Sequence, residues 1–431
     1  MSKTRQILDV LRDYESRNIV FMEPDGSWPI VWDRAREVHV WDADGKKYLD
    51  LTAAFGVAAA GHANPRVVKA GQKQMARLLH AMGDVHPSAR KAELARKLSR
   101  ITFERWSGGK KSGKVIFGNS GFEAVEAALK TAMLATGKHG IIAFTGAYHG
   151  LGYGALNATH RNFFRGPFHS QLREFGHFVQ FPSRPGELAN IEWNIRRLFH
   201  REWIGAILVE PVQARAGINL PPKEFLPMLR KICGELGALL ILDEIYTGFG
   251  RTGKWFACEH SGVTPDLICL GKALTGGFPL SACVGRADIM DTAWPASRGE
   301  AIHTSTFLGH PVGCAMALAQ IEEIRKLKLP EHSAELGKFL LGELQSKISH
   351  PKLQIAVRGL GLMAGVELRL ADGRPATAAV MQAIKAMLRR GYILLPEGEH
   401  GNVISLTPPL TITQAQLAKA VKTLADVLAG H

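Results

Sequence analysis

The sequence predicts an α/β protein whose core is a mostly parallel sheet. The first observation is a set of short, unbroken apolar runs, at residues 140–144, 206–209, 238–242 and 267–270. Such runs, bounded by Gly and charge, are typical of strands buried on both faces of a parallel sheet. The second is a set of helical segments between them, at residues 122–136, 186–200 and 223–236. This β-α-β order requires right-handed crossovers. The third is that polar residues follow the runs, at the sheet edge where ligands bind.

Length and composition indicate an ordinary globular protein. The chain has 431 residues, of which 46% are hydrophobic and 21% charged, enough for two domains or for one large domain with a satellite. Its net charge of +14 favours anionic ligands. The basic residues are scattered, however, and no basic helix face interleaved with aromatic residues is present, so nucleic-acid binding is not expected.

The cysteines and the apolar segments indicate a cytoplasmic protein. The five cysteines show no C-x-x-C spacing, so we expect reduced core residues, with neither a disulfide framework nor a metal site. The first 30 residues contain no apolar signal segment, and no run of 18 apolar residues occurs. We therefore expect no secretion through this segment and no membrane span.

The two chain ends are predicted to form a small α+β domain beside a large one. Residues 38–50 are expected to form a hairpin around Asp44-Gly45, and a helix is expected at 64–79. Beyond about residue 330, two amphipathic helices, at 334–348 and 376–390, flank a strand at 362–369. A further strand at 403–406 and a last helix from Thr413 follow. We expect the N-terminal part of the small domain at 1–70, the large domain at 71–328 and the C-terminal part at 329–431.

The first candidate ligand site is the turn Gly118-Asn119-Ser120-Gly121, which joins a short strand to an Ala-rich helix starting near Phe122. Ser120 and Glu123 have the spacing of a capping box. Small residues before a helix N-terminus form an anion site, since the unpaired N–H groups and the helix dipole point at the turn. The alternative is a plain N-cap without a ligand.

Two further strand ends carry polar or aromatic side chains. Tyr148 and His149 follow the run 140–144, and Glu210 follows the run 206–209. Tyr148 is suited to stacking on a planar ring, although a core aromatic residue fits the pattern equally well. We expect these residues at the same sheet edge as Ser120.

The most informative pair is Asp243 and Lys272, which end two neighbouring buried strands. Burying both charges is costly unless something uses them. Pyridoxal phosphate (PLP) uses both, because it forms an imine with a lysine amine and needs an anion beside its ring nitrogen. The alternative for the pair alone is a structural ion pair.

Taken in order, these motifs resemble the class III aminotransferases. The resemblance rests on Asn119-Ser-Gly, Tyr148-His-Gly, Glu210-Pro-Val-Gln, Asp243-Glu with Gly248-Phe-Gly-Arg-Thr-Gly253, Gly271-Lys272-Ala-Leu and Thr306-Phe-x-Gly-x-Pro311. It covers nearly the whole chain. That family consists of PLP enzymes of fold type I, the aspartate aminotransferase-like fold.

The resemblance implies a role for each matching residue. Lys272 would form the imine and move the proton, and Asp243 would pair with the ring nitrogen. Ser120, Gly121 and the Phe122 N–H would hold the phosphate at the helix N-terminus. The ring would lie between the side chains of Tyr148 and Ile245. Thr306 would reach the cofactor of a neighbouring subunit, which implies a homodimer with shared sites. His149 and Glu210 complete the cofactor-binding candidates, and Tyr148 joins Lys272 and Asp243 as a catalytic candidate.

Two departures from the family pattern bear on the substrate. Tyr246 stands where many relatives have a Gln that bonds the cofactor's phenolic oxygen, and Ser405 stands where amino-acid-specific relatives carry an Arg for the α-carboxylate. The loop 396–401 brings Glu397 and Glu399 instead of an Arg. We therefore expect an amine or ω-amino donor with a small 2-oxo acid acceptor, namely pyruvate in preference to 2-oxoglutarate. The alternative is that Arg161, Arg165 or Arg298 restores dicarboxylate binding.

The same residues are compatible with other functions to different degrees. Gly248-x-Gly-x-x-Gly253 matches the dinucleotide fingerprint, but no helix is expected to open at these glycines, which disfavours an NAD-dependent dehydrogenase. A PLP-dependent racemase or epimerase remains an alternative, because the same imine chemistry serves both reactions. So does a 2-oxoglutarate-dependent aminotransferase of the 4-aminobutyrate or ornithine type.

Overall fold

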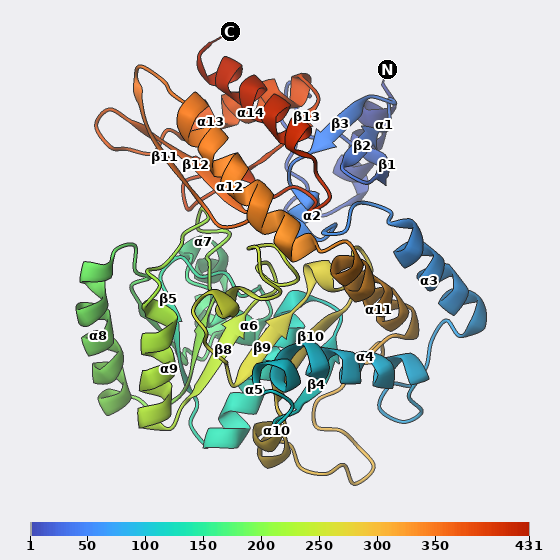
Figure 1. The fold of residues 1–431 in the computed structure, drawn as a ribbon, viewed down its shortest axis with the longest axis vertical. Coiled ribbons are helices and arrows are strands. Elements are labelled where there is room, and N and C mark those ends of the chain that lie inside the picture. The colour runs from blue at the N-terminus through green and yellow to red at the C-terminus, as the bar shows by residue number, and fades with distance from the viewer. Residues whose placement is uncertain (1, 431) are drawn as a thin grey trace.

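The computed structural model describes residues 2–430, and its centre is a seven-stranded sheet of order β4-β10-β9-β8-β7-β5-β6 (Figure 1). The strands are β4 (Gly113–Gly118), β5 (Gly140–Phe144), β6 (Gly176–Val179), β7 (Ile204–Val209), β8 (Leu239–Asp243), β9 (Leu267–Leu270) and β10 (Ser281–Arg286). All neighbouring pairs from β9 to β6 are parallel, whereas β10 runs antiparallel to both β4 and β9. The predicted fold class, α/β with a mostly parallel central sheet, is confirmed.

Helices cover both faces of this sheet because its strands are apolar on both sides. Leu240 and Leu242 of β8 belong to the core cluster that contains Phe225 of α9 (Phe225–Leu236) and the buried side chains of α8 (Leu188–Arg201). Ile241, between them, points to the opposite cluster with α5 (Gly121–Thr136). The continuous apolar runs of the sequence are therefore strands buried from two sides.

Both chain ends contribute to a second, smaller group of elements, which lies at the top of Figure 1 with both termini. One sheet has the order β1-β2-β3-β13, and another the order β11-β12-β15-β14. Their strands are β1 (Trp32–Arg36), β2 (His39–Asp42), β3 (Lys47–Asp50), β11 (Leu353–Gly359), β12 (Ala364–Leu370), β13 (Tyr392–Ile393), β14 (Leu395–Glu397) and β15 (Val403–Leu406). The long helices beside them are α12 (Leu329–Lys347), α13 (Thr377–Arg389) and α14 (Gln414–Leu428). The predicted hairpin is present as β2 and β3, which pair antiparallel.

The remaining helices connect these two groups or lie in loops. They are α1 (Lys3–Tyr14), α2 (Ala53–Gly56), α3 (Pro65–Arg77), α4 (Ala89–Ser99), α6 (Tyr153–Leu156), α7 (Asn162–Arg165), α10 (Ala287–Ala293) and α11 (Pro311–Lys326). None of the helices within residues 2–430 combines the length and the apolar character needed to cross a bilayer. All five cysteines are buried and carry no disulfide, as expected.

Six strands were not predicted, and all of them except β10 lie at the edge of a sheet: β1, β6, β11, β13 and β14. β6 and β11 end their sheets, and most of their residues are only partly buried. Their sequences mix polar and apolar residues, because an edge strand is not covered like a central one. The continuous apolar run, the signal that identified the inner strands, is therefore missing from them.

Candidate active site

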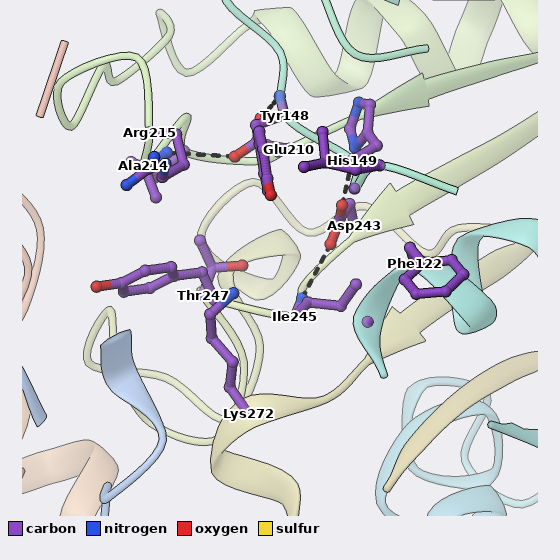
Figure 2. Close-up of a pocket in the computed structure, with 15 residues that line it drawn as sticks. Phe122, Tyr148, His149, Glu210, Ala214, Arg215, Asp243, Ile245, Thr247 and Lys272 are labelled. Carbon is purple, nitrogen blue, oxygen red and sulfur yellow. Dashed lines mark hydrogen bonds and ion pairs between the residues drawn. The ribbon is translucent and has the colours of Figure 1, made fainter. Parts of the chain in front are cut away.

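The carboxyl ends of the large sheet's strands meet at a cavity of about 340 Å³ (Figure 2). Eight of the predicted site residues line it: Gly121, Phe122, Tyr148, His149, Glu210, Asp243, Ile245 and Lys272. They lie at the carboxyl ends of β4, β5, β7, β8 and β9 or in the segments that follow these strands, including the start of α5. The sheet edge thus brings together side chains that are up to about 150 positions apart in the chain, which is what parallel strands do with their carboxyl ends.

Asp243 is held at the end of β8 by two hydrogen bonds. His149 Nδ1 lies 2.8 Å from Asp243 Oδ2, and the backbone N–H of Ile245 donates to Oδ1 at 3.1 Å (Figure 2). Only 5% of Asp243 is exposed. Since a carboxylate only accepts hydrogen bonds, Nδ1 carries the proton in this contact. His149 therefore fixes the orientation of a buried anion at the floor of the cavity.

Lys272 begins a short 3-10 helix directly after β9, with a backbone φ of 41°. This left-handed conformation is strained for a residue with a side chain, and such strain is often found at functional positions. Its Nζ lies 4.8 Å from the centroid of the Tyr246 ring. Burial lowers the pKa of Lys272, while the carboxylates of Asp243 and Glu210 oppose that shift. Burial therefore increases the share of neutral amine.

The capping box predicted for Ser120 and Glu123 is wrong. The Ser120 side chain makes no capping bond, and the Glu123 carboxylate instead accepts the backbone N–H of Asn119 at 2.7 Å. Ser120 Oγ is buried and has no hydrogen-bond partner in residues 2–430. Beside it, a Cβ on Gly121 would come within 3.2 Å of Ile245. The N-terminus of α5 thus has an unused hydroxyl, unpaired N–H groups and a close-packed glycine.

We expect Ser120→Ala to weaken cofactor binding without destabilising the protein that lacks the cofactor. A hydrogen bond to a charged group contributes about 1.5–3 kcal/mol, so the Kd for PLP should rise roughly 10- to 100-fold. A lost helix cap would instead cost about 1 kcal/mol of stability, but Ser120 makes no such bond. Equilibrium dialysis and the Tm of the cofactor-free variant separate the two. A lower Tm with unaltered PLP affinity would contradict the assignment.

Glu210 ties together the two loops that flank the cavity on the side of β5 and β7. Its Oε1 accepts the backbone N–H of Tyr148 at 3.0 Å, and its Oε2 accepts that of Ala214 at 3.2 Å. Burial raises the pKa of Glu210 to about 7. Through these bonds Glu210 fixes the backbone that carries Tyr148, whose ring lies at the cavity wall.

Thr306 does not line the cavity, and unlike Ser120, which is also absent from the lining, it is not next to a lining residue in the sequence. It is exposed, in the segment between α10 and α11. The segment packs against residues 78–86, for example through the contact of the Phe307 and His80 rings at 5.3 Å between centroids. The role of Thr306 toward a neighbouring subunit stays a prediction.

Three residues around the cavity were not among the predicted site residues: Arg215, which was missed, and Tyr246 and Glu397, which were noted only as departures from the family pattern. Arg215 lines the cavity five positions after Glu210, and Glu397 Oε2 lies 3.4 Å from Arg215 Nη1. Tyr246 also lines it, with its hydroxyl 3.1 Å from Thr407 Oγ1. Arg215 could have been found, because it follows a motif that had already been placed at the sheet edge. Ser405 is 3% exposed within β15 and does not line the cavity.

The glycines of the apparent dinucleotide fingerprint have a packing role. A Cβ on Gly250 would come within 3.3 Å of Pro330, and one on Gly253 within 2.9 Å of Ala334. Both contacts are with α12, and the segment forms turns instead of opening a helix. These glycines allow close approach of two parts of the chain, and the dehydrogenase alternative has no support.

The cavity fits pyridoxal phosphate on several independent counts. Two buried polar atoms, Ser120 Oγ and His149 Nε2, have no partner in residues 2–430. The first lies at the N-terminus of the 16-residue helix α5, which suits a phosphate, and the second belongs to the imidazole that holds Asp243. A buried carboxylate, an amine of lowered pKa and an aromatic ring complete the set. Fold and site together define a PLP-dependent enzyme of fold type I.

Comparisons with known proteins give the family. The family model for class III aminotransferases matches residues 21–428. The chain is 39% identical to the putrescine aminotransferase of Pectobacterium atrosepticum, over 90% of this chain and 80% of that one. It is 36% identical to the acetylornithine aminotransferase of Methanosarcina mazei, over 96% and 95% of the two chains. The protein belongs to the class III aminotransferases and is a PLP-dependent enzyme.

Two further similarities bear on its activity. The alanine/serine racemase of Pyrococcus horikoshii is 34% identical, over 94% of this chain and 87% of that one. Among solved structures, an amine transaminase from an uncultivated Pseudomonas species in its PLP-bound form is similar, with a TM-score of 0.85 and 28% identity over 96% and 98% of the two chains. The family therefore includes relatives named for different amino compounds and for a different reaction.

Proposed function

We propose that this enzyme transfers the amino group of an amine or ω-amino compound to a 2-oxo acid, with pyruvate as the acceptor, by a ping-pong mechanism. The supporting observation is the limited positive charge of the cavity. Of the lining residues, only Lys272 and Arg215 are Lys or Arg, so only one guanidinium lines the cavity. A dicarboxylate must take two carboxylates out of water, which calls for more than one such cation.

Four residues carry the chemistry in this proposal. Lys272 would hold the cofactor, and its Nζ would move a proton to and from the substrate Cα. Its lowered pKa supports that role, because the neutral amine is the form that accepts a proton. Asp243 would keep the ring nitrogen protonated, with His149 orienting it, and Tyr148 would pack on the ring. When bound, PLP supplies an electron-withdrawing ring that stabilises negative charge at the substrate Cα.

Steady-state kinetics with one amine and each acceptor in turn test the substrate assignment. We expect a specificity constant for pyruvate at least about tenfold above that for 2-oxoglutarate, since one additional unpaired carboxylate costs on the order of 1.4 kcal/mol or more. A specificity constant that is higher for 2-oxoglutarate than for pyruvate would contradict the proposal. The amine panel should include putrescine, because a relative is named for it.

Racemisation is the second candidate, and the 34% identity to an alanine/serine racemase favours it. A racemase needs no acceptor. Incubating the holoenzyme with L-alanine alone and following optical rotation separates the two activities. Loss of rotation without any 2-oxo acid would support racemisation, and unchanged rotation would support amino transfer.

We further propose a homodimer in which Thr306 serves the neighbouring subunit's cofactor. Its support is an exposed apolar surface on the segment that carries Thr306 and on the segment packed against it, formed by Leu79, Met82, Val85, Ile302 and Phe307. Exposed apolar surface of this kind is typical of subunit interfaces. Light scattering should give about twice the 47.0 kDa of one chain. A fully active monomer would contradict shared sites.

The cysteines support a cytoplasmic location. All five are free and buried, which is the state expected in a reducing compartment.

A further inference from the structure

Arg215 is the only guanidinium that lines the cavity in the described part of the chain. It stands on the loop after β7 with about a third of its side chain exposed, and its guanidinium lies 5.6 Å from the centroid of the Tyr148 ring. Figure 2 shows it on the opposite side of the lining residues from Asp243 and Phe122. A planar fork of donors in this position is the group best suited to holding a carboxylate.

The ion pair between Arg215 and Glu397 is a loose one. Their closest atoms, Nη1 and Oε2, are 3.4 Å apart, whereas charge-assisted N–H···O bonds are typically about 2.7–2.9 Å long. Glu397 is 4% exposed, so it cannot turn to water for other partners. Arg215 therefore keeps donors available for a second anion, and Glu397 competes for the same guanidinium.

The backbone around this pair is fixed on both sides. The carbonyl of Arg215 accepts the N–H of Gly398 at 3.1 Å and Arg161 Nη2 at 3.3 Å. Gly398 follows Glu397 directly, so this bond joins the loop after β7 to the end of β14. Of the other candidates from the sequence, Arg161 supports this backbone instead of lining the cavity, and Arg165 pairs with Glu174 at 3.0 Å. Glu399 lines a neighbouring cavity together with Arg161.

We propose that the Arg215 guanidinium binds the carboxylate of the 2-oxo acid acceptor, and that Glu397 weakens this binding by competing for Arg215 and by repelling the incoming anion. This inference rests on the proposed function, because it assigns the acceptor's binding residue. It accounts for recognition of a carboxylate in a protein that has Ser405, and so no guanidinium, where amino-acid-specific relatives carry an Arg. It also explains discrimination between pyruvate and 2-oxoglutarate, because the second carboxylate of 2-oxoglutarate would meet Glu397 and no further guanidinium lines the cavity to bind it.

The two members of the pair should have opposite effects when neutralised. Arg215→Gln removes the cation that receives the acid, whereas Glu397→Gln removes the competitor and keeps the shape of the side chain. We expect the first to weaken binding of a carboxylate roughly 10- to 100-fold, the effect of losing a charge-assisted hydrogen bond. We expect the second to tighten it several-fold. If the pair had only a structural role, both variants would bind the carboxylate more weakly than the wild type.

The experiment uses the PLP-loaded protein and propionate, which has the carboxylate and length of pyruvate but cannot react. Its Kd is measured by calorimetry for the wild type, Arg215→Gln, Glu397→Gln and the matched control Arg165→Gln, which removes an arginine outside the cavity. The control should leave the Kd within twofold of the wild type. An unaltered Kd in Arg215→Gln, or weaker binding in Glu397→Gln, would overturn the proposal.

A pH series adds a second, independent measurement. Burial raises the pKa of Glu397 to about 7, so this carboxyl is anionic above neutral pH and uncharged below it. The charged or titratable groups that act on it are Arg215, Arg161, Lys272, Tyr148 and Tyr246. Propionate should therefore bind more tightly as the pH falls through about 7. Glu210 titrates near the same pH, so the pH series is repeated with Glu397→Gln. If the pH dependence of the propionate Kd disappears in this variant, the inference is supported; if it persists, the inference is contradicted.

Turnover then distinguishes this inference from the proposed function. With putrescine as donor, Arg215→Gln should lower the specificity constant for pyruvate at least tenfold more than the one for putrescine, which has no carboxylate. If the wild type proved inactive with pyruvate, the proposed acceptor would be wrong. The propionate measurements would still decide whether Arg215 is the carboxylate-binding residue.

Discussion

Lys272→Ala is expected to abolish turnover and to leave the fold intact. The variant loses both the covalent attachment of the cofactor and the group that moves the proton at the substrate Cα. General acid-base catalysis alone contributes about 10²- to 10⁴-fold, and the covalent step adds to this, so we expect a drop of about 10⁴-fold or more. The visible absorbance of the Lys272-linked cofactor should disappear as well.

The protein itself should tolerate this change well. Burial lowers the pKa of Lys272, which shows that the surroundings disfavour the charged amine. Removing it therefore relieves a cost, and alanine is no more strained than lysine at the φ of 41°. The Tm of the cofactor-free variant should stay within a few degrees of the wild type. Lys254→Ala, at a side chain that bonds the carbonyl of Glu259 outside the cavity, is the control. A Lys272→Ala enzyme with a near wild-type rate would show that the site assignment is wrong.

Asp243→Asn should bind PLP but lose several powers of ten in rate. An ion pair at about 4 Å is worth about 4 kcal/mol at an effective dielectric constant of 20, which is roughly three pKa units. An amide of the same shape keeps the hydrogen-bond geometry toward the Ile245 N–H but not the charge. The ring nitrogen would then lose its proton near neutral pH, and with it most of its capacity to withdraw electrons.

Two measurements separate this electrostatic effect from a loss of structure. Equilibrium dialysis should show PLP bound to Asp243→Asn, and a cofactor analogue methylated at the ring nitrogen should recover part of the rate, because its charge is permanent. Asp291→Asn, on the exposed surface beside Lys114, serves as the charge-matched control. Unaltered turnover in Asp243→Asn would mean that the reaction does not depend on this anion.

The sequence was sufficient to locate Asp243 and Lys272 because each ends a strand that is apolar on both faces. A buried run followed by a charge is a local signal, and the parallel topology brings such ends together. The same reasoning located Glu210, Tyr148 and His149 at the cavity. The domain boundaries near residues 70 and 328 stay a prediction.

Other features depend on packing that the local sequence does not encode. Ser120 has the spacing of a capping box with Glu123, but the Glu123 carboxylate accepts the backbone N–H of Asn119 instead. Either arrangement gives this carboxylate a backbone N–H donor near the start of the helix, so the local sequence does not distinguish them. The Arg215–Glu397 pair joins segments that are 182 positions apart in numbering, from different sheets. Nothing in either segment alone indicates the other. The edge strands β6 and β11 lack the buried run altogether.

The sheet β1-β2-β3-β13 has a consequence for how the chain is made. β3 pairs with β13 through Leu49 and Tyr392, and Lys46 Nζ also bonds the carbonyl of Arg389, 343 positions away. On the ribosome the N-terminal hairpin emerges early and must wait, with one edge unpaired, until nearly all of the polypeptide has been translated. An unpaired edge is a site of association with other chains. The nascent protein therefore exposes this edge to association with other chains during that interval, which ends when β13 has left the exit tunnel.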